Sequence, residues 1–108
     1  MKKCDVVTLG EVLIDFTPCG VSPAGQPLFE RNAGGAPANV AVAVAQLGGT
    51  SSFISMTGAD SFGAFLRGTI KAKGVDVSSM KETSDQHTTL AFITLSDSGE
   101  RSFSFCRN

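Results

Sequence analysis

Clustered positive charge, paired cysteines and long apolar runs are all missing from this sequence of 108 residues. Lys and Arg total 9 against 10 Asp and Glu, with no basic run, so we expect neither a nucleic-acid nor a membrane-surface partner. No apolar stretch approaches the roughly 20 residues of a membrane helix. The three cysteines form no CxxC pair and are odd in number, which predicts reduced thiols. Only three residues precede the first predicted strand, too few for a signal peptide, so we expect a cytoplasmic protein.

Several catalytic signatures are missing as well. No Gly-x-Gly-x-x-Gly follows the first predicted strand, and no Gly-Lys-Ser/Thr of a P-loop is present. The lone His87 lies in a polar connection without an identifiable triad partner, and we predict a surface residue. Glu11 and Asp15 would lie roughly 13 Å apart on an extended strand, beyond the roughly 5–9.5 Å of a glycosidase pair. These absences exclude the commonest nucleotide-binding loops and hydrolase sites.

What the sequence does contain is a hydrophobic content of 42% and 12 glycines, which together predict a globular domain with frequent tight turns. Apolar periodicity predicts one helix that begins near Pro37 and ends before Gly48. It predicts a second helix that has Asp60 as its N-cap and ends before Gly74. Residues 17–26 and 78–86 are predicted to be connections. Alternating or apolar runs predict strands at residues 4–9, 11–16, 28–32, 51–56, 75–77, 89–95 and 101–107.

This order of elements predicts an α/β fold with a mostly parallel sheet flanked by helices. The strand at residues 4–9 is expected to be buried, and the helix after Pro37, apolar nearly all round, to be buried on most sides. Residues 11–32 and 88–107 interrupt the strand–helix alternation. We predict that they form a smaller β layer that acts as a movable lid over a ligand.

One stretch, AGGAPANVAVAVAQLGGTSSFISMTGAD, is the most informative part of the chain. Its glycines, proline and asparagine resemble the first signature of the ribokinase-like carbohydrate kinases, also called the phosphofructokinase B family. The matching positions are Gly34, Gly35, Pro37, Asn39, Ala41, Gly48 and Gly58. LGEVLIDF near the start and ERSFSFCRN near the end resemble segments of fructokinases. The resemblance covers the whole chain but only the front portion of a family member, so residues 1–108 are expected to be the N-terminal, sugar-binding part of a ribokinase-like domain.

The resemblance implies a set of substrate-binding residues. Family members hold the sugar with residues that match Asp15, Gly35 and Asn39, and Gly34 lies beside them. Physical chemistry agrees, because sugar hydroxyls need short polar groups, charge-assisted bonds to a carboxylate are strong, and glycines let a ligand approach the backbone. Related sugar kinases place an arginine near the substrate, which here matches Arg107.

The resemblance also implies ATP and Mg²⁺ as cofactors and phosphoryl transfer to a hydroxyl of fructose. In the family an aspartate within a Gly-Ala-Gly-Asp segment is the catalytic base, and no such segment occurs here. We therefore assign no catalytic, cofactor-binding or metal-binding residue and expect this machinery outside the 108 residues. Two alternatives remain: a kinase for another sugar, sugar acid or nucleoside, or a short non-catalytic sugar-binding module.

Some alternatives stay open for individual residues. Asp15 could be a turn residue, the two glycines a tight turn before a helix, and Asn39 a residue that bonds locally. Glu11 fits a salt bridge and a substrate neighbour equally well. A homodimer that associates through the β-lid is a further expectation from the resemblance.

Overall fold

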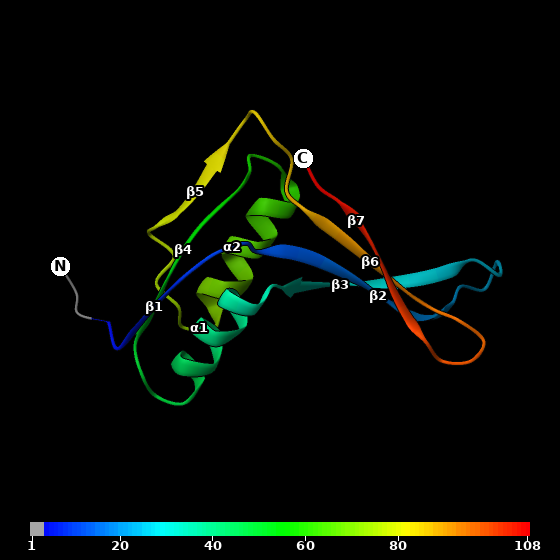
Figure 1. Cartoon of the computed structure of the whole chain (residues 1–108), viewed down its shortest axis with the longest axis horizontal. Coiled ribbons are helices and arrows are strands. Elements are labelled where there is room, and N and C mark those ends of the chain that lie inside the picture. Colours follow the sequence, from blue (N-terminus) through cyan, green and yellow to red (C-terminus); the bar gives the residue numbers. More distant parts are fainter. Residues whose placement is uncertain (1–3) are drawn as a thin grey trace.

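The computed structural model describes residues 4–108, which fold into two sheets and two helices (Figure 1). The chain start on which we based the absence of a signal peptide lies outside the described residues. The helices are α1 (Ala36–Gln46) and α2 (Ser61–Ala72). The strands are β1 (Val6–Leu9), β2 (Leu13–Val21), β3 (Pro27–Gly34), β4 (Ser51–Gly58), β5 (Met80–Thr83), β6 (Leu90–Leu95) and β7 (Arg101–Cys106).

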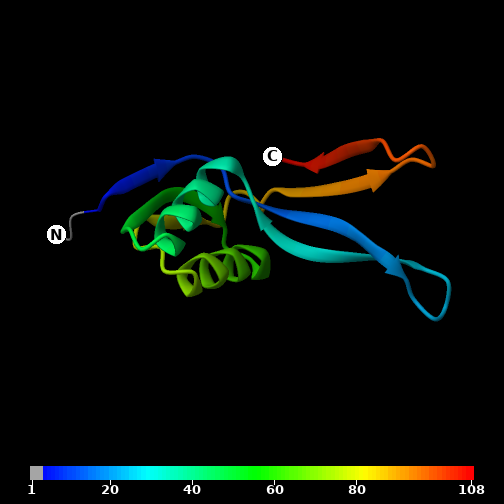
Figure 2. The same cartoon turned by 90° about the horizontal axis from the view of Figure 1, so that it is seen from below.

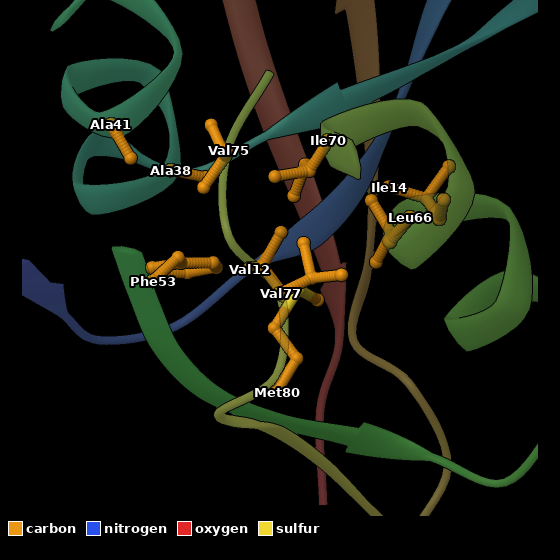
Figure 3. Close-up of a cluster of buried hydrophobic side chains, with 10 residues drawn as sticks. All are labelled: Val12, Ile14, Ala38, Ala41, Phe53, Leu66, Ile70, Val75, Val77 and Met80. Carbon is orange, nitrogen blue, oxygen red and sulfur yellow. The ribbon is translucent and has the colours of Figure 1, made fainter. Parts of the chain in front are cut away.

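The smaller sheet has the strand order β1-β4-β5 and is parallel throughout. Both helices contribute side chains to the single core that packs against it, around the fully buried Phe53 of β4 (Figure 3). The ten buried members of this cluster are Val12, Ile14, Ala38, Ala41, Phe53, Leu66, Ile70, Val75, Val77 and Met80. The predicted α/β class with a parallel sheet is confirmed.

The prediction that the first strand is buried is wrong for one of its faces. Val7 and Leu9 are exposed, and Leu9 is paired with the exposed Ile54 of β4. Side chains alternate across a strand, so these residues share one face of the sheet with Met56. Ser52 on this face is buried, but the apolar side chains of Val7, Leu9 and Met56 are more than half exposed, so the strand remains half exposed.

Helix α1 begins where the sequence predicts, with Pro37 in its first turn, where a missing N–H costs no hydrogen bond. Its predicted burial on most sides is wrong. Only Ala38 and Ala41 are buried, whereas Val40 is 50% exposed. The helix packs on β1 and β4, with Val42 and Ala45 only partly buried against the core.

Helix α2 follows its predicted pattern closely. The side chain of Asp60 accepts a hydrogen bond from the N–H of Gly63, as an N-cap residue does. Leu66 and Ile70 of the predicted apolar stripe are fully buried. Gly74 follows the helix end with φ +94°, a backbone conformation that other residues adopt only with strain.

The larger sheet has the strand order β3-β2-β6-β7 and extends away from the helices as a long twisted arm (Figure 2). It consists of two antiparallel hairpins, β2–β3 and β6–β7, which are joined by parallel pairing between β2 and β6. The antiparallel partners of β6 and β7 confirm the hairpin predicted around residues 96–99. Residues 11–32 and 88–107, the two segments that interrupt the strand–helix alternation, thus pair with each other in one sheet.

Two predicted connections contain strands. β2 continues through Pro18 to Val21, although residues 17–26 were predicted to be a loop. Its pairing with β6 ends at Phe16, so Pro18 lies where β2 has a free edge, and a proline is tolerated there. β5 lies within the connection predicted at residues 78–86, whereas residues 75–77 form only an isolated bridge at Asp76. As an edge strand paired with β4 alone, β5 needs little apolar sequence.

Candidate functional site

The centre of the candidate site is the contact between Asp15 on β2 and Gly34 at the end of β3. The carboxylate of Asp15 lies directly over Gly34, so that a Cβ atom at this position would overlap Oδ2. Antiparallel pairing produces this contact, because Leu13 lies opposite Gly34 and Asp15 opposite Asn32. The absence of a side chain at Gly34 thus leaves the space that the carboxylate occupies.

The Asp15 carboxylate is half-buried and accepts no hydrogen bond from any described residue. Desolvation by this burial raises the pKa of Asp15 above its ordinary value. A partly desolvated acceptor that has no partner among residues 4–108 is well suited to accept hydrogen bonds from a ligand.

Gly35 turns the chain from β3 into α1 and can only be glycine. It is the N-cap with φ +109° and ψ 130°, and no side chain caps the helix. A Cβ atom here would lie 2.6 Å from the carbonyl oxygen of Glu11. The first N–H groups of α1 therefore have no side-chain partner, which leaves donors at the end of the helix that faces Gly34.

Asn39 lies one helical turn further on, where its backbone N–H donates to the carbonyl of Gly35 at 3.0 Å. Its side chain is exposed. Asp15, Gly34 and Gly35 are thus in contact or adjacent, and Asn39 extends the same surface along α1. The structure thus brings Asp15, Gly34 and Gly35 together and links Asn39 to them through its backbone bond to Gly35.

Arg107 is held separately, on the far side of β6. Its guanidinium forms an ion pair with Glu11 at 2.9 Å, and the side chains of the two residues are 49% and 46% exposed. The same guanidinium lies over the ring of Phe105, 4.1 Å from its centroid. Glu11 thus forms the salt bridge that was one of its two predicted roles, and it directs Arg107 toward the base of β2.

The two faces of the larger sheet have different surroundings. The register places Phe16, Arg31 and Phe92 on one face. There Phe16 contacts Phe62 of α2 edge-on at 6.0 Å, and Arg31 lies 3.8 Å above the ring of Phe65. This aromatic contact docks the base of the sheet on α2.

The opposite face carries Asp15, Asn32, Ala91 and Phe105, which lie side by side across the four strands. Phe105 on this face is about half exposed, whereas the opposite face contacts α2. A ligand held by Asp15 would therefore lie on this open side of the sheet.

Asn32 is a residue of this surface that the sequence did not single out. It lies opposite Asp15, and its Nδ2 donates to the hydroxyl of Thr17 at 3.0 Å. The sequence placed Asn32 at the end of the strand predicted at residues 28–32. It did not give the register in which this strand pairs with its neighbour, so it could not show that Asn32 lies opposite Asp15. Another missed group, Asp60 with Thr88, lies at the start of β6.

Two cavities near the sheets have different positions relative to these residues. One of about 230 Å³ lies at the carboxyl ends of β4 and β5, and Glu11, Gly58, His87 and Asn108 are among its lining residues. A larger one of about 510 Å³ lies at the opposite, amino-terminal edge around Ser51. Ligands of parallel sheets bind beyond the carboxyl ends, so only the smaller cavity is relevant to the site.

The described residues also include His87, and they can be searched for membrane-spanning helices and for metal-binding groups. His87 is exposed, as predicted, and its Nδ1 lies 2.8 Å from the carbonyl oxygen of Thr88. Neither helix within residues 4–108 is long and apolar enough to cross a membrane. In the same residues no three His, Cys, Asp or Glu side chains form a group that could hold a metal ion.

Comparison with known proteins shows which proteins this chain resembles. The profile described as "pfkB family carbohydrate kinase" matches residues 3–108. The fructokinase of Solanum tuberosum is 49% identical over 105 residues, which cover 95% of this chain and 33% of the potato protein. The crystal structure of fructokinase with bound ATP from Xylella fastidiosa is 47% identical, with a TM-score of 0.84, over 94% of this chain and 30% of that one.

A third relative was solved with ligands: Vibrio cholerae fructokinase in a fructose, ADP and calcium ion bound form. It is 36% identical, with a TM-score of 0.82, over 95% of this chain and 32% of its own. Such matches define a phosphotransferase fold of the sugar-kinase class. The chain belongs to the pfkB family of carbohydrate kinases and spans about a third of the length of these relatives.

Proposed function

We propose that residues 1–108 form the N-terminal, sugar-binding part of an ATP-dependent kinase that phosphorylates a hydroxyl of fructose. The observation that carries this proposal is the partly desolvated carboxylate of Asp15, which lies over Gly34 at the entrance to α1 and accepts no hydrogen bond from residues 4–108. Relatives that are 47% and 49% identical to this chain are named fructokinases, and a fructokinase that is 36% identical was solved with fructose.

The proposed sugar lies on the open face of the larger sheet. Asp15 accepts hydrogen bonds from two neighbouring hydroxyls, the helix start beyond Gly35 donates, and Asn39 both donates and accepts. Arg107, fixed between Glu11 and Phe105, contributes its remaining N–H donors from the other side of β6. These groups bind and orient the hydroxyls, and none of them is assigned as the catalytic base.

ATP and Mg²⁺ belong to the proposal for the whole enzyme, in which the nucleotide supplies the phosphoryl group and the cation balances its charge. No residue of this chain is assigned to either. The cytoplasmic location and the homodimer expected from the sequence stay predictions. Phe103 and Phe105, which are stacked and about half exposed on the Asp15 face, are the side chains that a contact between two lids would use.

The proposal is tested by comparing the chain alone with a chimera in which residues 1–108 replace the matching third of the Xylella fastidiosa enzyme. With fructose and Mg-ATP, we expect the chimera to release ADP and the isolated chain to release none above a no-enzyme control, because the chain holds no Gly-Ala-Gly-Asp segment. A folded chimera that phosphorylates another sugar, a sugar acid or a nucleoside in preference to fructose would contradict the proposed substrate. Turnover by the isolated chain that Asp15→Ala abolishes would contradict its non-catalytic role.

A second test concerns the lid. We propose that residues 11–32 and 88–107 close over the sugar and exclude water from the reacting hydroxyl. In the chimera, hydrogen exchange in the distal parts of both hairpins should be fast without fructose and should slow in both when fructose is added. Strand β1 should change little. Hairpins that are as protected as β1 before fructose is added would show a fixed sheet.

A further inference from the structure

Three segments of the chain meet around the carboxylate of Asp60. Oδ1 accepts hydrogen bonds from the N–H of Gly63 at 2.8 Å and from the hydroxyl of Thr88 at 2.7 Å. Oδ2 accepts from the N–H of Thr88 at 2.9 Å. The hydroxyl of Thr88 in turn accepts from the N–H of Gly58 at 3.1 Å. The start of α2, the end of β4 and the chain entering β6 are thereby joined, and Figure 1 shows β6 starting beside the first turn of α2.

This junction is tightly packed and has few alternative arrangements. Thr88 is only 2% exposed. A Cβ atom at Gly58 would lie 2.6 Å from the N–H nitrogen of Thr88 and 2.7 Å from the carbonyl oxygen of Gln86. The backbone of β4 therefore approaches the incoming chain as closely as glycine allows.

The charge of Asp60 is stabilised at this junction. Partial desolvation acts to raise its pKa, but hydrogen bonds from Thr88 and Gly63, together with the charge of His87, outweigh it and lower the pKa below the ordinary value. A folded-state pKa below the unfolded one adds stability that is present above the unfolded pKa and is lost as the pH falls through the folded one. The ionised carboxylate is thus the form that holds the junction together at neutral pH.

The junction leads directly to the candidate sugar site. The residue after Thr88 is Thr89, whose carbonyl accepts a hydrogen bond from the N–H of Ile14 at 3.1 Å. This bond begins the parallel pairing in which Asp15 lies opposite Ala91. Pairing of β6 with β7 then sets where Arg107 lies. The position at which Asp60 holds Thr88 therefore fixes the register of the strands that carry both charged residues of the site.

We infer that Asp60 is a positioning residue of the sugar site: through Thr88 it anchors the start of β6 and so sets the place of Asp15 and Arg107. This inference rests on the proposed function for its effect on the sugar. The anchoring itself can be measured in the chain without any substrate. Asp60 is also the N-cap of α2, so its two roles have to be separated.

Asp60→Asn separates the two roles. Asparagine caps helices as well as aspartate does, so Gly63 keeps its acceptor. The other end of the amide is then a donor that faces the N–H of Thr88, so this bond of the anchor is lost and only the bond from the Thr88 hydroxyl remains. Asp85→Asn is the matched control, because Asp85 lies in the preceding exposed turn and its carboxylate accepts none of the hydrogen bonds of the junction. A second pair is Thr88→Val, which removes the hydroxyl, and Thr88→Ser, which keeps it.

In the isolated chain, we expect Asp60→Asn and Thr88→Val to speed hydrogen exchange about tenfold or more at residues 14–16 and 90–92, relative to Asp85→Asn and Thr88→Ser. Exchange in the middle of α2 should stay within about twofold, because the cap is kept. In the chimera, kcat/KM for fructose should fall about tenfold while KM for ATP stays close. If Asp60→Asn does not fold, the two Thr88 variants make the same comparison.

Unchanged exchange at residues 14–16 and 90–92 in Asp60→Asn and Thr88→Val would overturn the anchoring. Faster exchange there together with an unchanged kcat/KM for fructose would overturn the positioning role. A chimera that is folded but inactive on fructose even with native Asp60 would count against the proposed function, and exchange in the isolated chain would still decide whether Asp60 anchors β6.

Discussion

Asp15→Asn in the chimera is expected to lower kcat/KM for fructose by about 10- to 150-fold, the range that a charged hydrogen bond of about 1.5–3 kcal/mol implies. The amide keeps the size of the carboxylate over Gly34 but loses its charge. One of its two ends also becomes a donor that faces hydroxyl donors of the sugar. Initial rates at varied fructose and varied ATP measure the effect, and KM for ATP should stay within about twofold.

Asp97→Asn provides the control for this variant. Asp97 is exposed in the turn between β6 and β7, at the far end of the same sheet, so the same loss of charge occurs there away from the site. Its kcat/KM for fructose should match that of the unmodified chimera. Equal values for Asp15→Asn and Asp97→Asn would remove Asp15 from the site.

The same substitution should have the opposite effect on stability. Because burial raises the pKa of Asp15, the folded chain binds its proton more tightly than the unfolded chain, and stability falls as the pH rises through the pKa. Asparagine does not ionise, so the variant should melt at a higher temperature than the native chain at pH 7. The difference should shrink as the pH is lowered until Asp15 is protonated in both states. A catalytic or binding group that costs stability is a common compromise at functional sites.

The features predicted well from the sequence are those set by local chemistry. Pro37 in a first turn, Asp60 as N-cap and Gly74 after the helix end each depend on a few neighbouring residues, and all three are found in place. The hairpin at residues 96–99 is equally local. For Asp15 and Gly34, the family resemblance predicted only that both belong to the sugar site. It did not predict that the two residues are in contact.

The features that the sequence did not predict depend on partners far along the chain. Thr88 is bonded to Asp60 across 28 positions, and nothing in a polar connection indicates which carboxylate it will meet. β5 is a strand because β4 offers it an edge, since its own sequence is too polar to predict one. The burial of α1 was overestimated because apolar composition shows what a helix could bury, whereas the elements beside it decide what is covered.

Gly35→Ala is expected to be the most destabilising change in the candidate site. The positive φ of +109° alone strains a non-glycine residue by about 1–3 kcal/mol. The new Cβ would also lie 2.6 Å from the carbonyl oxygen of Glu11, and relieving such an overlap costs about 1–3 kcal/mol more. Moving Glu11 would in addition disturb its ion pair with Arg107. Loss of fructose turnover in the chimera should therefore accompany the loss of stability.

Gly25→Ala is the control that has the backbone strain without the overlap. Gly25 lies in the β2–β3 turn with a φ of +83°, and an added Cβ would meet no atom within 4 Å. Thermal unfolding of the isolated chain, followed by circular dichroism, compares the two variants. Both should melt below the native chain, and Gly35→Ala should melt lower than Gly25→Ala by about 4 °C or more, the shift expected for at least 1 kcal/mol in a domain of this size. Only Gly35→Ala should impair fructose turnover in the chimera, since the turn at Gly25 lies far along the hairpin from Asp15. Equal melting temperatures and equal activities would mean that α1 and the backbone of Glu11 can separate freely, and that their close approach at Gly35 does not build the site.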